Sequence, residues 1–227
     1  MWGVSVKLDE TGMKQIRCNQ MMTAKRCSWC ERDALYRAYH DEEWGRPIHD
    51  DRRLFELLVL ESFQAGLSWY TILAKREGFR AAFDGFDYRL IAAYDDAKVE
   101  ALMQDVRIVR NRQKILATIQ NAARFMEVQQ EFGSFSEFIW AFVGGSPCVN
   151  HPRKLEDVPA SNQTSEAIAA ELKRRGFKFF GTTVAYAFMQ SAGLVNDHIE
   201  DCAFKYPDGL KPHRRCFSQV SGLSASP

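Results

Sequence analysis

Two pairs of cysteine and histidine residues, at opposite ends of the chain, have the types and spacing to bind a metal ion. Cys27 and His40 lie near the start, and His198 and Cys202 lie four residues apart near the end. On a helical turn, side chains four residues apart project from one face, so His198 and Cys202 can bind one ion. Cys27 and His40 would complete a tetrahedral shell, and four protein ligands leave zinc no open position for water or substrate. The pattern predicts a structural clasp between the two ends.

The spacing leaves other interpretations of these residues open. Cys27 and Cys30 form a CxxC, which could hold zinc through both thiolates instead of through His40. The chain also contains 6 cysteines and 5 histidines, enough for chance proximity.

Glu61 is the carboxylate with the strongest case for chemistry. It follows Leu54, Leu57 and Leu58 at helical spacing, which places it on the apolar face that they form. A buried carboxylate is unfavourable unless it has a partner or a function. A tight turn then returns Trp69 to the side of Glu61. The alternative is a structural glutamate that pairs with an arginine or caps the next helix.

Four aromatic residues lie within a few positions of Glu61 or of a candidate zinc ligand: Trp29, Tyr39, Trp44 and Trp69. Burial in the core is the usual fate of such side chains. However, Trp29 and Trp44 have polar neighbours in the sequence, which favours a place in a ligand-binding pocket over burial in the core. A pocket with aromatic walls and one carboxylate suits a flat, cationic ring, which it would bind by stacking and cation–π attraction.

The turn between Gly176 and Gly181 has the features of an anion site. Its terminal glycines permit left-handed or closely approaching backbone, and the helix predicted from Thr182 begins with unpaired N–H groups. Four basic residues and no acidic residue surround the turn: Lys173, Arg174, Arg175 and Lys178. Such a turn resembles the helix-hairpin-helix element that holds DNA phosphate through backbone N–H groups. The alternative is an ordinary turn with a solvated basic face.

The elements that must position these residues are helices. The chain has 227 residues, of which 46% are hydrophobic, and shows no sustained period-two alternation, so the sequence predicts an all-α fold. The predicted helices cover residues 50 or 51 to 64, 68–76, short segments opened by Asp87 and Asp95, 111–131, 134–143, 164 or 165 to 175, and 182–192. We expect a loop from 147 to 162. Apolar residues in helix 111–131 form a stripe: Ile115, Ile119, Ala122 and Met126.

Residues 1–26 are predicted to be a weakly structured extension, 27–210 a single helical domain and 211–227 a C-terminal tail. The sequence shows no membrane span or signal peptide, which predicts a cytoplasmic protein with reduced cysteines. The net charge is only +1, so a nucleic acid would have to be held by a local basic patch.

Five segments resemble, in order, the motifs of the 3-methyladenine DNA glycosylase I family, a branch of the helix-hairpin-helix DNA glycosylases. They are Cys27–Trp29, Tyr39–Gly45, Leu60–Trp69, Arg175–Phe179 and Gly193–His198. The resemblance implies a helix-hairpin-helix glycosylase-like domain that flips 3-methyladenine out of double-stranded alkylated DNA and releases it as the free base. It implies further that the protein is a monomer and does not bind a membrane. It also implies one structural Zn²⁺ per chain, bound by Cys27, His40, His198 and Cys202.

The same resemblance assigns roles to the remaining residues. Glu61 is expected to act in the base pocket by recognition and electrostatics more than by activating water. The expected pocket walls are Tyr39, Trp44 and Trp69, with Trp29 at the mouth. The expected phosphate contacts are Gly176, Lys178, Gly181, Thr182 and Thr183. Related enzymes that cut the backbone place a lysine just after the last hairpin glycine, so the threonines here predict a monofunctional enzyme without lyase activity.

Asp197 is expected to orient the neighbouring zinc ligand. Two other function classes stay open at this stage. One is a DNA-binding protein that keeps the clasp and the hairpin but does not excise bases. The other is a zinc enzyme in which water replaces one protein ligand.

Overall fold

The computed structural model describes residues 24–206. The predicted tail 211–227, and the predicted extension apart from its last three residues, lie outside the described residues. The described part is mainly helical, as predicted for an all-α protein. Its α-helices are α2 (Ala34–Glu42), α3 (Asp51–Gln64), α4 (Trp69–Ala74), α5 (Arg76–Ala82), α6 (Tyr88–Ala92), α7 (Asp96–Gln104), α8 (Arg112–Phe132), α9 (Phe135–Ala141), α10 (Gln163–Arg174) and α11 (Thr182–Ser191). Three short 3₁₀ segments are Ser28–Cys30, Asp84–Phe86 and Leu155–Asp157.

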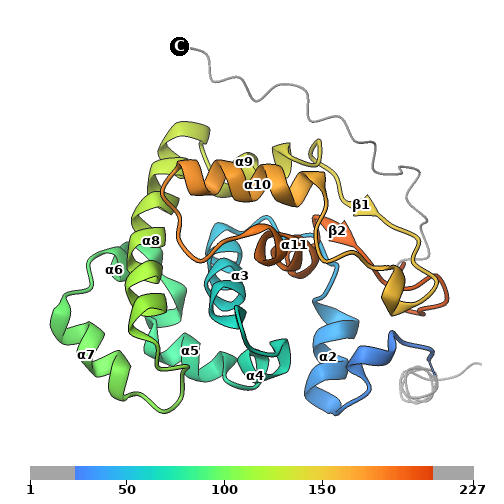
Figure 1. The fold of residues 1–227 in the computed structure, drawn as a ribbon, viewed down its shortest axis with the longest axis horizontal. Helices are drawn as coiled ribbons and strands as arrows, with labels where there is room; N and C mark the ends of the chain where they lie inside the picture. Colours follow the sequence, from blue (N-terminus) through green and yellow to red (C-terminus); the bar gives the residue numbers. More distant parts are fainter. Residues whose placement is uncertain (1–23, 207–227) are drawn as a thin grey trace, which may run out of the picture.

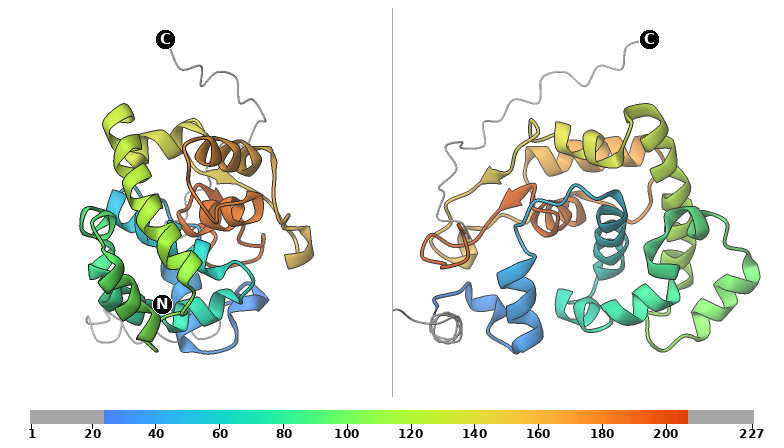
Figure 2. Two further views of the ribbon diagram at one scale, coloured as in Figure 1. Left: turned by 60° about the vertical axis from the view of Figure 1, so that its left-hand side comes forward. Right: turned by 180° about the vertical axis from the view of Figure 1, so that it is seen from behind.

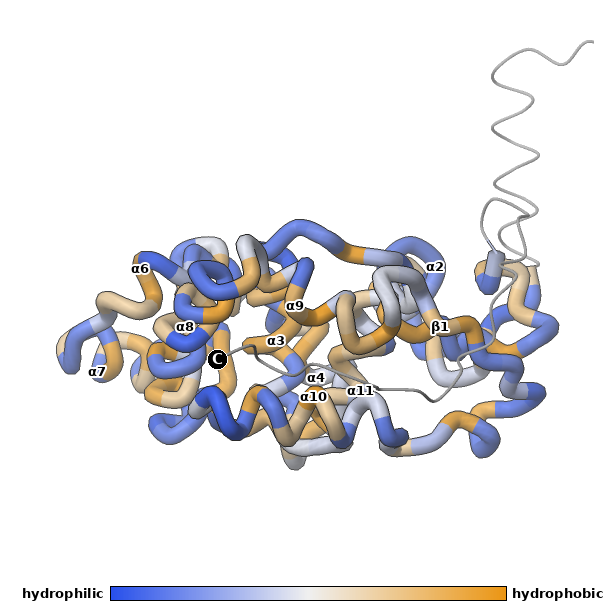
Figure 3. Tube along the Cα trace, turned by 90° about the horizontal axis from the view of Figure 1, so that it is seen from above, coloured by the Kyte–Doolittle hydropathy of each residue, from blue (hydrophilic) through white to orange (hydrophobic). Residues whose placement is uncertain are grey.

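Helix α3 is the centre of the molecule. Every residue from Leu54 to Phe63 is buried, because α4, α8, α9 and α11 all contact this helix. Figure 1 shows α3 between α5–α8 on one side and α2 on the other, and the view from behind in Figure 2 agrees. Hydrophobic residues concentrate around α3 and α9 in Figure 3, and hydrophilic residues predominate in the outer turns. The helix that carries Glu61 is therefore held on all sides.

Local capping chemistry determines where most helices begin. The side chains of Asp50, Ser68, Asp87, Asp95 and Asn111 accept a hydrogen bond from a backbone N–H of the first turn that follows. These starts agree with the sequence prediction, and Ser134 likewise caps α9.

Other predicted boundaries need correction. Asn162, and not Thr164 or Ser165, caps α10, because Asn162 and Ser165 form a reciprocal capping box. The helix predicted over 68–76 ends earlier, at Ala74, and Arg76 begins the separate helix α5. In α8 the buried position is Phe125, whereas Met126 is half-buried, because the helix turns its buried face slightly away from the predicted stripe.

The structure contains two short strands, one of which lies in the predicted loop 147–162. Strands β1 (Cys148–Val149) and β2 (Val195–Asn196) pair in parallel, with Cys148 opposite Val195. Strands this short carry no readable alternation, so the sequence could not predict them. Cys27, Cys30 and Cys202 are free thiols, as expected, but Cys148 is disulfide-bonded, so the expected reduced state fails there.

No helix in residues 24–206 has the length and apolar character needed to cross a membrane.

Candidate functional site

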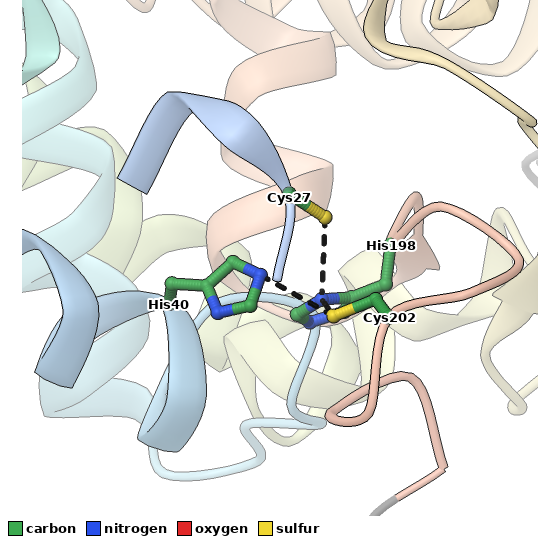
Figure 4. A group of neighbouring side chains, drawn as sticks. All are labelled: Cys27, His40, His198 and Cys202. Carbon is green, nitrogen blue, oxygen red and sulfur yellow. Dashed lines mark hydrogen bonds between the residues drawn. The ribbon is translucent and has the colours of Figure 1, made fainter. Parts of the chain in front are cut away.

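The four predicted metal ligands come together in one buried cluster, drawn in Figure 4. Cys27 precedes the first 3₁₀ segment, His40 lies on α2, and His198 and Cys202 lie in the loop after β2. All four side chains are buried, and their ligand atoms lie within 4.8 Å of one another. The Sγ of Cys202 lies 3.3 Å from Nδ1 of His198 and 3.5 Å from Nε2 of His40. The cluster thus joins the first described segment to the last.

One detail of this cluster differs from the sequence prediction, and a second concerns the alternative ligand Cys30. His198 and Cys202 do not lie on an α-helix; a turn, in which the N–H of Cys202 donates to the carbonyl of Ile199 at 2.9 Å, brings them together. Cys30 lies outside the group, and its thiol donates to the carbonyl of Cys27 at 3.1 Å.

Neighbouring oxygen atoms fix the orientation of both imidazoles. Nδ1 of His40 hydrogen-bonds with Oδ1 of Asp41 at 2.7 Å, and Nε2 of His198 with the carbonyl of Trp44 at 3.0 Å. The other nitrogen of each ring therefore faces the thiols. Arg26 holds the Asp41 carboxylate in turn, at 2.8 Å. Such outer partners are typical of histidines that bind metal.

The cluster has the electrostatics of a cation site. A hydrogen bond from Cys27 lowers the pKa of Cys202 to about 2, and the same interaction raises the pKa of Cys27. Burial lowers the pKa of His40, but hydrogen bonds with Cys202, Cys30 and Asp41 outweigh it and raise that pKa to about 10. Two buried thiols and two buried imidazoles match the donor set that binds zinc tetrahedrally.

A cavity of about 380 Å³ lies beside this cluster. Its walls include all the residues predicted for the base pocket: Trp29, Tyr39, Trp44, Glu61 and Trp69. Helices α2, α3, α4 and α11 and the loop 155–160 supply the lining. A space of this size is in the range of small-molecule sites.

Glu61 is the buried acid of this cavity, only 3% exposed. Burial raises its pKa to about 8, and a hydrogen bond with Ser191 opposes that shift. Oε2 of Glu61 and Nε1 of Trp69 are buried, and the described residues give neither a hydrogen-bond partner. An unpartnered buried polar atom is unfavourable by about 1–3 kcal/mol, so the pair is suited to a ligand with a donor and an acceptor.

Aromatic rings form the rest of the pocket wall. The ring centroids of Tyr39 and Trp69 are 5.3 Å apart at a tilt of 47°, and those of Trp29 and Trp44 are 5.0 Å apart, edge to face. Burial, and secondarily the charge of Glu61, raises the pKa of Tyr39 well above its usual value, so its hydroxyl stays a donor. Trp29 is only half-buried, consistent with a place at the mouth.

Sequence reasoning missed the part of the cavity that α11 supplies. Tyr186 and Gln190 line the cavity from that helix; their i, i+4 spacing was the available signal. Asp197 was expected to orient the neighbouring zinc ligand, but its carboxylate does not hydrogen-bond to the four-residue cluster. Its carboxylate accepts hydrogen bonds from Tyr186, Gln190 and Asn150, and it is Asp41 that orients a candidate zinc ligand.

The predicted phosphate turn connects α10 to α11. Gly176 is left-handed with φ of 88°, as predicted, but Gly181 is extended with φ of −81°, and Phe179 takes the second left-handed position with φ of 55°. The amide of Asn121 on α8 holds the turn, because it accepts from the N–H of Lys178 at 2.8 Å and donates to the Lys178 carbonyl at 3.0 Å.

The surroundings of this turn are less basic than the sequence predicted. Arg174 pairs with Glu171, and Arg175 pairs with both Glu171 and Glu131, so two of the four cations have partners. Lys178 is exposed and has no ion-pair partner among the described residues.

Helix α11 begins next to this turn without a side-chain cap. Thr182 and Thr183 in its first turn are exposed, and Thr183 also lines the cavity. The start of α11 therefore lies between the turn and the cavity.

Comparison with known proteins gives one consistent result. A family model described as methyladenine glycosylase matches residues 29–206. DNA-3-methyladenine glycosylase 1 of Escherichia coli (strain K12) is 48% identical over 188 residues, which cover 83% of this chain and 100% of that protein. DNA-3-methyladenine glycosylase of Haemophilus influenzae (strain ATCC 51907 / DSM 11121 / KW20 / Rd) is 45% identical over 180 residues, covering 79% and 97%.

Solved structures are similar over the same part of the chain. A crystal structure of 3-methyladenine DNA glycosylase I matches with a TM-score of 0.77 at 50% identity, covering 79% of this chain and 98% of that one. A Staphylococcus aureus structure, described as the basis of 3-methyladenine recognition, also has a TM-score of 0.77, at 37% identity, covering 79% and 96%.

Proposed function

The chain belongs to the methyladenine glycosylase family, and we propose that it removes 3-methyladenine from alkylated DNA as a base-excision-repair enzyme. The observation that carries this proposal is the pair of unpartnered polar atoms, on Glu61 and Trp69, inside an aromatic cavity. An adenine edge offers both an amino donor and ring-nitrogen acceptors, which complement that pair.

The cavity suits the charge of the damaged base. 3-Methyladenine carries positive charge while it is attached to the sugar, so its glycosidic bond is weak and the base leaves as a neutral ring. Tyr39, Trp44 and Trp69 supply aromatic faces for cation–π attraction, and Trp29 stands where the extruded nucleotide enters. Ordinary adenine is neutral and gains less from these walls. Selection of the flipped base is therefore most of the enzyme's task.

Glu61 acts in this proposal by recognition and electrostatics. Its carboxylate accepts a hydrogen bond from the base and stabilises positive charge on the nucleotide as the glycosidic bond breaks. The base departs as a neutral ring with the electron pair of the broken bond, water adds to the sugar carbon, and the proton that this water loses passes to the solvent.

The helix-hairpin-helix role falls to residues 176–183. Lys178, the uncapped start of α11 and its two exposed threonines would hold the DNA phosphates, which positions the duplex without reading its sequence. Thr182 and Thr183 follow Gly181 where lyases of this superfamily have a lysine. We therefore propose a monofunctional enzyme that acts on double-stranded DNA as a monomer.

A structural Zn²⁺ completes the proposal. Cys27, His40, His198 and Cys202 would bind it, because their buried donor atoms cluster and both imidazoles are already oriented. When bound, the ion supplies cross-linking of the two ends and no catalytic chemistry. The described residues 27–206 would then act as one domain closed by this clasp.

Release of free bases from methylated DNA, separated by chromatography, tests the proposed function. Wild type should release 3-methyladenine, and Glu61→Gln should lose at least about 100-fold of that rate while still binding DNA, since an electrostatic contact in the transition state is removed. Glu77→Gln, at an exposed position on α5, is the control and should match wild type. Correctly folded wild type that binds DNA and releases no base would instead identify a non-catalytic DNA-binding protein.

A further inference from the structure

Asp197 is a buried carboxylate directly behind the wall of the cavity. It is 2% exposed and accepts three hydrogen bonds. The hydroxyl of Tyr186 and Nε2 of Gln190 both donate to its Oδ2, each at 2.8 Å, and Nδ2 of Asn150 donates to its Oδ1 at 2.7 Å. All three partners are neutral, and two of them line the cavity. The mechanism above gives this group no role.

The carboxylate determines which way the amide of Gln190 points. A carboxylate only accepts hydrogen bonds, so Gln190 must turn its NH₂ group toward Asp197 and its Oε1 away. None of the described residues donates a hydrogen bond to that oxygen, and Gln190 faces the cavity. Glu61, from α3, lines the same cavity. A fixed acceptor therefore stands in the same cavity as Glu61, on the neighbouring helix.

We infer that Gln190 is a specificity-determining residue whose Oε1 accepts a hydrogen bond from the exocyclic amino group of the bound base, and that Asp197 is the positioning residue that orients it. This inference rests on the proposed function, which it deepens. A 6-amino purine satisfies the acceptor, whereas a 6-keto purine places one oxygen against another. Sites built to hydrogen-bond a ligand group reject analogues that lack it, because a buried polar atom is then left unpaired.

The test compares the binding of two free bases, 3-methyladenine and 3-methylhypoxanthine, through quenching of the tryptophans that line the cavity. We expect wild type to prefer the amino base, and Gln190→Leu to reduce the ratio of the two dissociation constants by roughly tenfold, as for one lost hydrogen bond. The ratio is measured on one protein preparation, so partial unfolding or lost metal changes both constants together and leaves it unaltered.

Two further variants separate orientation from packing. Asp197→Asn can donate to Gln190 and lets its amide turn round, so the ratio should fall as it does in Gln190→Leu. Asn150→Ala removes a hydrogen bond from the same carboxylate, but at Oδ1, and should leave the ratio as in wild type.

The possible outcomes distinguish this inference from the proposed function. If wild type prefers 3-methyladenine and Gln190→Leu keeps the full preference, the inference that Gln190 determines specificity is wrong, while the proposed function stands. If Asn150→Ala changes the ratio as much as Asp197→Asn, orientation through Oδ2 is wrong. A wild type that binds neither base and releases none from DNA overturns both.

Discussion

Glu61 illustrates how one residue can be tuned by its surroundings. Packing around α3 removes the side chain from water, and burial raises its pKa to about 8. In the free enzyme near neutral pH the acid is therefore mostly protonated. A cationic base in the cavity favours the charged form, so binding of the damaged nucleotide and ionisation of Glu61 reinforce each other.

This coupling predicts the pH dependence of excision. The value of kcat/KM should rise as pH increases toward about 8 and level off above it, because the carboxylate form of free Glu61 is the active one. Initial rates of 3-methyladenine release from pH 5.5 to 9.5 measure this. Glu61→Gln should lack the rising limb. A wild-type rate that falls over the same range would show that the protonated acid is the active form.

The same pKa predicts a stability difference. The folded-state pKa of Glu61 lies above its unfolded value, so its favourable contribution to folding is fully present below about pH 4.5 and is lost as pH rises through about 8. Glu61→Gln should therefore match wild type near pH 4.5 and exceed it at pH 9 by a few kcal/mol in the free energy of unfolding. Denaturant titrations at both values check this. An equal difference at both pH values would contradict it.

Sequence reasoning succeeded at residues whose evidence is local. Glu61 was recognisable because helical spacing alone puts it on an apolar face. Asp197 was assigned wrongly because adjacency to His198 in the chain suggested contact, whereas an extended segment points neighbouring side chains in opposite directions. One of its actual partners, Asn150, directly follows β1, and nothing local in the sequence indicates such a pair.

At the level of elements, α3 ends with an unusual cap. The carbonyls of Phe63 and Ala65 accept from Nζ of Lys114 on α8, at 2.8 and 2.7 Å, and Lys114 is buried. A cation at a helix C-terminus satisfies carbonyls that have no partner within the helix. This contact fixes the turn that leads from Glu61 to Trp69.

Lys114→Met should therefore lower the free energy of unfolding by about 2–3 kcal/mol, because two carbonyls lose a charged donor. The midpoint of a urea titration measures the change. Lys98→Met removes a partly exposed lysine that pairs with Asp84 and should cost under about 1 kcal/mol. Equal decreases in the free energy of unfolding of the two variants would contradict the capping role of Lys114.

The hairpin before α11 predicts a salt effect. Lys178→Ala should weaken DNA binding and reduce the slope of log affinity against log salt by about 1, as for one lost phosphate contact. Arg174→Ala, at the end of α10, removes a cation that already pairs with Glu171 and should change the slope less. Fluorescence anisotropy with an abasic duplex at several salt concentrations measures both. Identical slopes for the two variants would contradict a phosphate contact by Lys178.

Helix starts were predicted well, and the details between helices were not. Asp50 and Asn111 cap helices through their own side chains, a signal contained within four residues. The pairs that Glu171 forms with Arg174 and Arg175 have i, i+3 and i, i+4 spacing, a signal that the sequence contained and the prediction overlooked. The pair between Arg175 and Glu131 was not foreseeable, because Glu131 lies on a different helix.

For the whole molecule, the cluster of Cys27, His40, His198 and Cys202 joins the first described segment to the last. Cys27→Ser should abolish stoichiometric zinc and lower the melting temperature, because one of four ligands is lost and metal binding contributes to folding. Cys30→Ser should keep one zinc per chain. Metal analysis after dialysis, with thermal unfolding, checks both. If Cys30→Ser lost its zinc and a variant without His40 kept it, the CxxC ligand set would be favoured instead.

The architecture of the chain was predicted from composition, but its closure was not. Helical patterning gave the all-α class, while the pairing of β1 with β2, which places the His198 loop, depends on two residues in each strand. The resemblance to a family supplied the ligand set that spacing left open between Cys30 and His40.

The proposed clasp also implies an order of events during synthesis of the chain. Cys27 leaves the ribosome long before His198, and Trp44, a wall of the cavity, gives its carbonyl to His198 at 3.0 Å. A nascent chain can therefore form α3 and bury Glu61 while one side of its pocket is still unsupported. The pocket is finished only when the segment around His198 returns to the segment around Trp44, so a chain truncated before residue 198 has the acid and the aromatic rings but not this closing contact.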